Sequence, residues 1–119
     1  MYEIQFYKDK HGKTEVVEYI KTLNKRALTS KESRINLNKI VAYMDMLEEV
    51  GTRIGEPVTK HLEGEIWELR PLKNRILYAY YKENKFVILH YFIKKTNKTP
   101  KREIERAKNN LKDFIERSK

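Results

Sequence analysis

Apolar and polar residues follow two different rhythms in the first half of the chain. Residues 2–7 alternate between apolar and polar side chains, which predicts a β-strand. His11-Gly12 breaks this alternation. From Thr14 onward the apolar residues recur at helical spacing, namely Val16, Val17, Ile20 and Leu23. This spacing predicts a short amphipathic helix.

A second, longer helix is predicted next. Thr29-Ser30-Lys31-Glu32 has the form of a capping box, with Thr29 as the predicted N-cap. A single apolar stripe then runs over about four turns, through Leu37, Ile40, Val41, Met44, Leu47 and Val50. Gly51 stands where a helix end favours a left-handed residue.

The second half of the chain contains three strand-like runs, residues 66–70, 75–81 and 86–95, separated by gaps of hairpin length. We expect these three strands to form an antiparallel meander, and the strand of residues 2–7 to join the edge of that meander. Residues 52–62 are expected to connect the second helix to the meander. Thr99-Pro100 supplies an N-cap and a proline for a last amphipathic helix. The order β-α-α-β-β-β-α predicts an α+β fold, a small antiparallel β-sheet with packed helices, in one domain over residues 1–119.

The composition of the chain limits the kinds of molecule that the protein can bind and the cell compartment in which we expect it. The 26 Lys and Arg residues outnumber 17 Asp and Glu residues, and the net charge of +9 favours polyanions such as nucleic acid. There is no cysteine, and the three histidines lack metal-ligand spacing, so we expect no metal and no cofactor. The N-terminus does not resemble a signal peptide and no apolar stretch is long enough to span a membrane, so we expect a cytoplasmic protein without a membrane partner.

Strand parity indicates a candidate site on the meander. Glu68 and Arg70 share one face of their strand, which we expect to be the open one, whereas Trp67 is predicted as a core anchor on the other. Arg75 begins the next strand, so Arg70 and Arg75 can reach a single phosphate from the two ends of one turn. The alternative is that both arginines are hairpin charges paired with Glu68 or other carboxylates. Opposite faces, or internal carboxylates that hold both arginines, would exclude the phosphate site.

The last strand ends in Lys94 and Lys95, whose side chains point to opposite faces. Only one of them can join the arginines, and parity alone does not say which. His90 has apolar neighbours, which favours a structural role in the sheet over a catalytic one.

Residues 58–110 resemble the RelE/ParE superfamily of toxins, in its HigB or phage-derived Gp49-like branch. Three motifs carry the resemblance: W-E-L-R at 67–70, R-x-x-Y at 75–78, and L-H-x-F-x-K-K-x-x-K-T-P at 89–100. The resemblance implies a ribosome-dependent, metal-independent endoribonuclease that cleaves mRNA. It also implies a HigA-like helix-turn-helix antitoxin as partner, in a toxin–antitoxin hetero-oligomer.

The resemblance assigns roles to several basic residues. It implies that Arg70 and Arg75 bind the scissile phosphate and that Lys94 and Lys95 form a catalytic basic cluster. Either lysine can serve as the general base, because neighbouring cations favour the neutral form of an amine, and His90 is the alternative. Further RNA contacts are expected from Lys60, His61, Lys73 and Lys98.

Two features separate the chain from RelE itself. RelE has lysines where this chain has Ile66 and Glu68, and it has a tyrosine near the start of a final helix that here contains none. Two other functions fit the same sequence: a ParE-like gyrase poison on the same fold, and a non-catalytic basic nucleic-acid-binding module.

Overall fold

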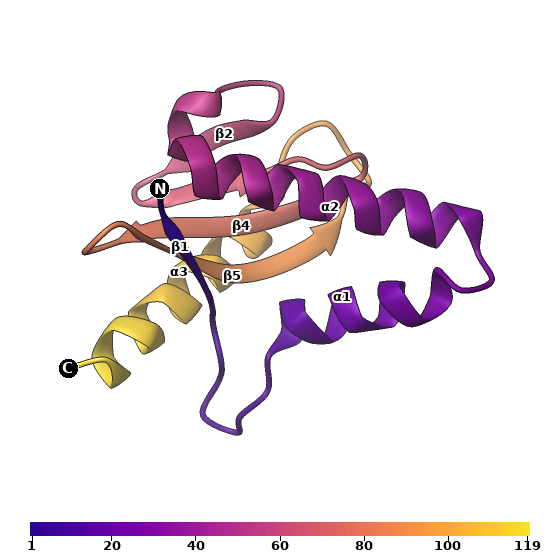
Figure 1. Ribbon diagram of the computed structural model, residues 1–119. Helices are drawn as coiled ribbons and strands as arrows, with labels where there is room; N and C mark the ends of the chain where they lie inside the picture. Colours follow the sequence, from indigo (N-terminus) through magenta and orange to yellow (C-terminus); the bar gives the residue numbers. More distant parts are fainter.

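The computed structural model describes all residues from 1 to 119. One five-stranded sheet of order β1-β5-β4-β3-β2 lies between α1 and α2 on one face and α3 on the other (Figure 1). The expected α+β fold is confirmed. The elements are β1 (Glu3–Phe6), α1 (Glu15–Arg26), α2 (Lys31–Val50), the 3-10 helix η1 (Gly51–Ile54), β2 (Thr59–Glu63), β3 (Ile66–Leu69), β4 (Asn74–Tyr81), β5 (Lys85–Ile93) and α3 (Lys101–Arg117).

The sheet differs from the expected meander in two ways. β1 joins its edge as predicted but runs parallel to β5, so the sheet is mixed. Alternation shows which residues share a face, and it does not give the direction of the partner strand. The expected connection over 52–62 also contains β2, which pairs antiparallel with β3. Its sequence Thr-Lys-His-Leu-Glu is too polar to show a strand pattern.

The helix ends are displaced slightly from the predicted caps. Ser30, and not Thr29, caps α2, because its hydroxyl accepts a hydrogen bond from the Ser33 amide at 3.2 Å. Pro100 is the N-cap of α3, which has no side-chain cap hydrogen bond. The predicted Thr99 cap is therefore absent. Gly51 does adopt the positive φ expected of it, at 73°.

The sheet divides the core into two layers. On the α1–α2 face, Val16, Leu23, Ile40 and Leu47 of the helices pack against Leu69, Ile76, Tyr78, Phe86 and Ile88. On the α3 face, Ala107, Leu111 and Phe114 pack against Ile66, Leu77, Ala79, Val87 and Leu89. Trp67 is half-buried against the first layer, as predicted. The face expected to be open is thus partly covered by α3.

Candidate functional site

Arg70 and Arg75 are brought opposite one another by the register of β3 and β4. The paired positions end at Leu69 and Ile76, so the next position in this register joins the two arginines. Residues that face each other across antiparallel strands lie on the same side of the sheet. The two arginines therefore share a face, as predicted. Like charges in facing positions are destabilising, so this arrangement requires a nearby anion.

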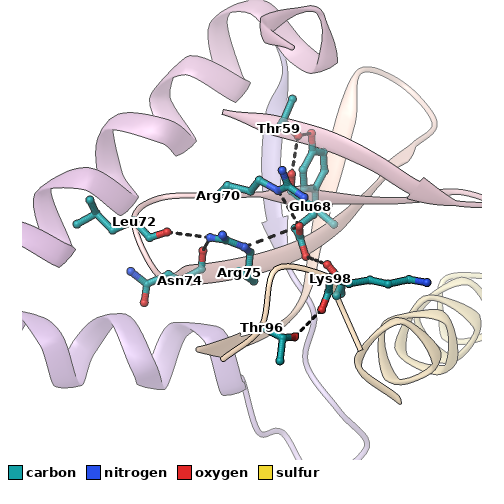
Figure 2. Close-up of polar contacts among 10 residues, drawn as sticks. Thr59, Glu68, Arg70, Leu72, Asn74, Arg75, Thr96 and Lys98 are labelled. Carbon is teal, nitrogen blue, oxygen red and sulfur yellow. Dashed lines mark hydrogen bonds and ion pairs between the residues drawn. The ribbon is translucent and has the colours of Figure 1, made fainter. Parts of the chain in front are cut away.

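Glu68 is that anion, and its side chain is fully buried. Arg70 Nε donates to Glu68 Oε1 at 2.9 Å, and Arg75 Nε lies 3.9 Å from the same oxygen. The Thr99 hydroxyl donates to Glu68 Oε2 at 2.6 Å. Figure 2 shows dashed lines from Arg70 and from Arg75 to this carboxylate, while the far end of the Arg75 guanidinium points toward Leu72 and Asn74. The alternative in which the arginines pair with Glu68 is thus met by Arg70, which donates a hydrogen bond to the carboxylate. Arg75 lies 3.9 Å from it without a hydrogen bond, so an internal carboxylate holds one of the two arginines and the criterion that would exclude the phosphate site is not met.

This pairing leaves guanidinium donors free. Arg70 donates only through Nε, so its two Nη groups have no partner in the protein. Arg75 donates Nη1 to the carbonyls of Leu72 at 2.8 Å and Asn74 at 2.9 Å, which leaves Nη2. The side chains are 21% and 11% exposed. Two cations around one carboxylate carry a net positive charge, and their free Nη groups can bind an anion.

The pKa of the Arg75 guanidinium reflects this crowding. Burial lowers the pKa of Arg75, the Glu68 carboxylate opposes that shift, and the Arg70 cation adds to it. Arginine nevertheless stays charged in proteins, so the cluster keeps two cations.

Asn74 holds the turn between β3 and β4 in place. Its Nδ2 donates to the carbonyl of Pro71 and to Oδ1 of Asn36, both at 2.9 Å. Its Oδ1 accepts from the Tyr19 hydroxyl. Asn74 is buried, and sequence reasoning missed it. An asparagine that closes a Pro-Leu-Lys-Asn turn is the signal that could have identified it.

The register of β4 and β5 indicates the face of the sheet on which Lys94 and Lys95 lie. Arg75 faces Phe92 in the register of β4 and β5. The Lys94 amide donates to the Lys73 carbonyl at 2.8 Å, so the pairing continues past the end of β5. Lys94 directly follows Ile93, the last residue of β5, so continued alternation from Phe92 predicts Lys94 on the arginine face and Lys95 on the other.

His90 lies between two carboxylates and is buried. Its Nδ1 is 3.0 Å from Glu15 Oε1 and its Nε2 is 2.7 Å from Glu103 Oε1. Burial lowers the pKa of His90, but the hydrogen bonds to Glu15 and Glu103 outweigh this and raise it. A ring whose two nitrogens both contact carboxylates offers no free lone pair to a substrate, which argues against the predicted role of His90 as a catalytic base. The structural role is the one observed.

Lys60 and His61 are neighbours on β2 but lie on opposite faces. Lys60 faces Glu68 in the β2–β3 register and is exposed, so its side chain is on the arginine face. His61 faces Trp67, with ring centroids 5.1 Å apart, and its Nε2 is 2.7 Å from the Gly64 carbonyl. His61 is therefore not part of the arginine site, and its predicted RNA contact stays a prediction.

The two remaining lysines surround the site at a distance from its centre. Lys73 is exposed in the β3–β4 turn, where it lines a groove on the α1–α2 side. Lys98 is exposed in the loop before α3, and Figure 2 shows its side chain extending away from Arg70 and Arg75 toward that helix. Neither lysine joins the arginine cluster.

The structure contains no group of three His, Cys, Asp or Glu side chains that could hold a metal ion. None of its helices combines the length and the apolar character needed to cross a membrane.

The comparison with protein families matches most of the chain. The model of the family described as phage derived protein Gp49-like (DUF891) matches residues 18–112. The match includes Glu68, Arg70, Arg75, Lys94 and Thr99. No curated protein matches the chain.

Proposed function

Because the chain belongs to the phage derived protein Gp49-like family, we propose that it is a toxin of the RelE/HigB type that cleaves mRNA on the ribosome. One observation carries the proposal: Arg70 and Arg75 face each other beside a buried Glu68 and keep Nη groups without internal partners. The two free Nη groups of Arg70 form a fork that suits the two free oxygens of a phosphodiester, and the free Nη2 of Arg75 adds one further donor. The net charge of +9 supports a polyanionic substrate.

The proposed reaction needs no metal. The 2′-oxygen of a ribose attacks the adjacent phosphorus, the bond to the 5′-oxygen breaks, and a 2′,3′-cyclic phosphate remains. Arg70 and Arg75 stabilise the extra negative charge on phosphorus, and each such donor contributes about 2.7–4 kcal/mol. Lys94, the lysine on the arginine face, accepts the 2′-proton through the lone pair of its amine, and the departing 5′-oxygen takes up a proton from water. Lys95, on the other face, is assigned no step.

The proposed partner is a HigA-like helix-turn-helix antitoxin that forms a hetero-oligomer with the chain and neutralises it. The proposed site of action is the ribosome in the cytoplasm. A fold of this type does not fix its target, so a ParE-like action on gyrase and simple nucleic-acid binding are outcomes that the experiment must separate.

The experiment compares three proteins in a translation extract that contains a defined mRNA. We expect the wild type to cut the mRNA only while it is translated. We expect Arg75→Ala to cut about 100- to 1,000-fold more slowly, the effect of removing one oxyanion donor. Arg53→Ala is the matched control, because Arg53 is an exposed arginine in η1 and its loss changes the net charge equally.

Each result has a separate meaning. Wild-type cleavage by Arg75→Ala would remove the proposed site. Gyrase-dependent DNA damage without mRNA cleavage would favour the ParE-like function. Salt-sensitive RNA binding without any cleavage would leave only the binding module.

A further inference from the structure

We propose that Glu68 and Thr99 are positioning residues that hold the arginine pair where it stabilises the extra negative charge on phosphorus during cleavage. The inference rests on the proposed function, because it concerns how that site is organised. Neither residue is proposed to touch the RNA. Glu68 acts through the two arginines, and Thr99 acts through Glu68.

The Glu68 carboxylate is fixed from both of its oxygens. Oε1 accepts a hydrogen bond from Arg70 Nε at 2.9 Å and lies 3.9 Å from Arg75 Nε. Oε2 accepts a hydrogen bond from the Thr99 hydroxyl at 2.6 Å. The backbone of Glu68 is fixed as well, because its carbonyl accepts from the Thr59 hydroxyl at 2.9 Å. A buried carboxylate with these partners cannot rotate without losing a hydrogen bond to a charged group. It therefore sets the position of Arg70 and, less tightly, of Arg75.

The Thr99 hydroxyl does not cap α3, which leaves it free to support the positioning of Glu68. Threonine directly before a helix usually caps it, and such a cap contributes about 1 kcal/mol. Here α3 has no side-chain cap hydrogen bond, and the Thr99 hydroxyl reaches across to β3 instead. Thr99 also belongs to the loop that joins Lys94 to α3. The hydrogen bond to Glu68 thus ties the lysine end of the site to its arginine end.

The sign of the charge distinguishes positioning from binding. An acid between the arginines does not strengthen the attraction of a surface for RNA, because the acid cancels part of the positive field of the arginines. Replacement of Glu68 by glutamine removes one negative charge from the cluster. If Glu68 positions the arginines, Glu68→Gln binds RNA at least as tightly as the wild type and cleaves it more slowly.

The sharpest test uses Thr99→Val, which removes the hydroxyl and keeps the shape, with Thr99→Ser as the matched control. We expect single-turnover cleavage of translated mRNA to fall about tenfold in Thr99→Val, the loss expected from one hydrogen bond to a charged group. Thr99→Ser should stay within about twofold of the wild type, because it keeps the donor. The affinity for an RNA with a 2′-deoxy nucleotide at the cleaved position should not change in either variant.

Two results would overturn the inference. One is cleavage by Thr99→Val at the wild-type rate. The other is a loss of RNA affinity in Glu68→Gln that matches its loss of cleavage rate. Melting temperatures of all variants identify any loss that comes from unfolding, and Glu68→Gln remains as the test if Thr99→Val does not fold.

A second measurement separates this inference from the proposed function. The Nε–H proton of Arg70 gives an NMR signal that needs no RNA cleavage to be observed. We expect it to be protected from exchange in the wild type and in Thr99→Ser, and to exchange faster in Thr99→Val. An identical signal in Thr99→Val would reject the positioning role. Absence of cleavage by the wild type, with the NMR difference present, would reject the proposed reaction alone.

Discussion

Raising the pH should destabilise this fold, because the contacts with Glu15 and Glu103 favour the protonated form of His90. An unfolded histidine titrates near pH 6.5, and the two carboxylates raise the pKa of folded His90 above that value. The folded state therefore binds the proton more tightly than the unfolded state. The resulting stability is fully present below pH 6.5 and is lost as the pH rises through the folded pKa.

The size of the effect is bounded by the single proton involved. One proton gives a slope of at most about 1.4 kcal/mol of unfolding free energy per pH unit. The hydrogen bond to His90 lowers the pKa of Glu15 against the effect of burial, and Arg106, 3.4 Å from Glu15, adds to this lowering. The Glu15 carboxylate therefore stays charged over this range.

Urea denaturation between pH 5.5 and pH 9, on the wild type and on His90→Gln, measures this effect. Glutamine can donate one hydrogen bond but carries no charge. We expect His90→Gln to be destabilised by about 2 kcal/mol at pH 6, because hydrogen bonds to charged groups contribute about 1.5–3 kcal/mol each. The difference between the two proteins should shrink as the pH rises. A constant difference over the whole range would refute the assignment of His90 as a bound cation.

Two further predictions concern the fold and the RNA-binding face. Gly51→Ala should lower the unfolding free energy by about 2–3 kcal/mol in urea denaturation, because the new Cβ would lie 2.7 Å from the ring of Tyr2 at a φ of 73°. Unchanged stability would contradict that close contact. Lys60→Ala should weaken RNA binding and reduce the slope of log affinity against log salt by about 1, whereas His61→Ala, on the opposite face, should leave both unchanged. Equal effects of the two substitutions would show that binding does not use the arginine face.

The sequence predicts those parts of the fold that local patterns determine. The apolar spacing of α2 and α3 and the alternation of β3 to β5 led to the right elements, and the turn between β3 and β4 led to two arginines on one face. β2 was not predicted, because a short polar edge strand forms by pairing with its neighbour, here β3, and its own sequence shows no alternation of apolar and polar residues. Its position in the connection after α2 could not be read from composition.

The side-chain partners of the site were harder to predict, because they are far apart in the chain. His90 meets Glu15 across 75 residues, and Glu68 meets Thr99 across 31. A histidine with free nitrogens and a histidine held by two carboxylates have the same local sequence. Thr99 illustrates the same limit, since Thr-Pro before a helix predicts a cap and only tertiary packing redirects the hydroxyl.

β1 is synthesised before the other strands of the sheet but is one of the last to pair, because its partner is β5. Residues 3–6 pair with residues 85–88, so β1 has no strand partner until most of the chain has been synthesised. Thr99 and α3 are synthesised later still. A chain released early would lack the closed sheet edge and the loop that fixes Glu68. We therefore expect products that end before Thr99 to lack the proposed RNA cleavage, because they lack the residue that fixes the Glu68 carboxylate.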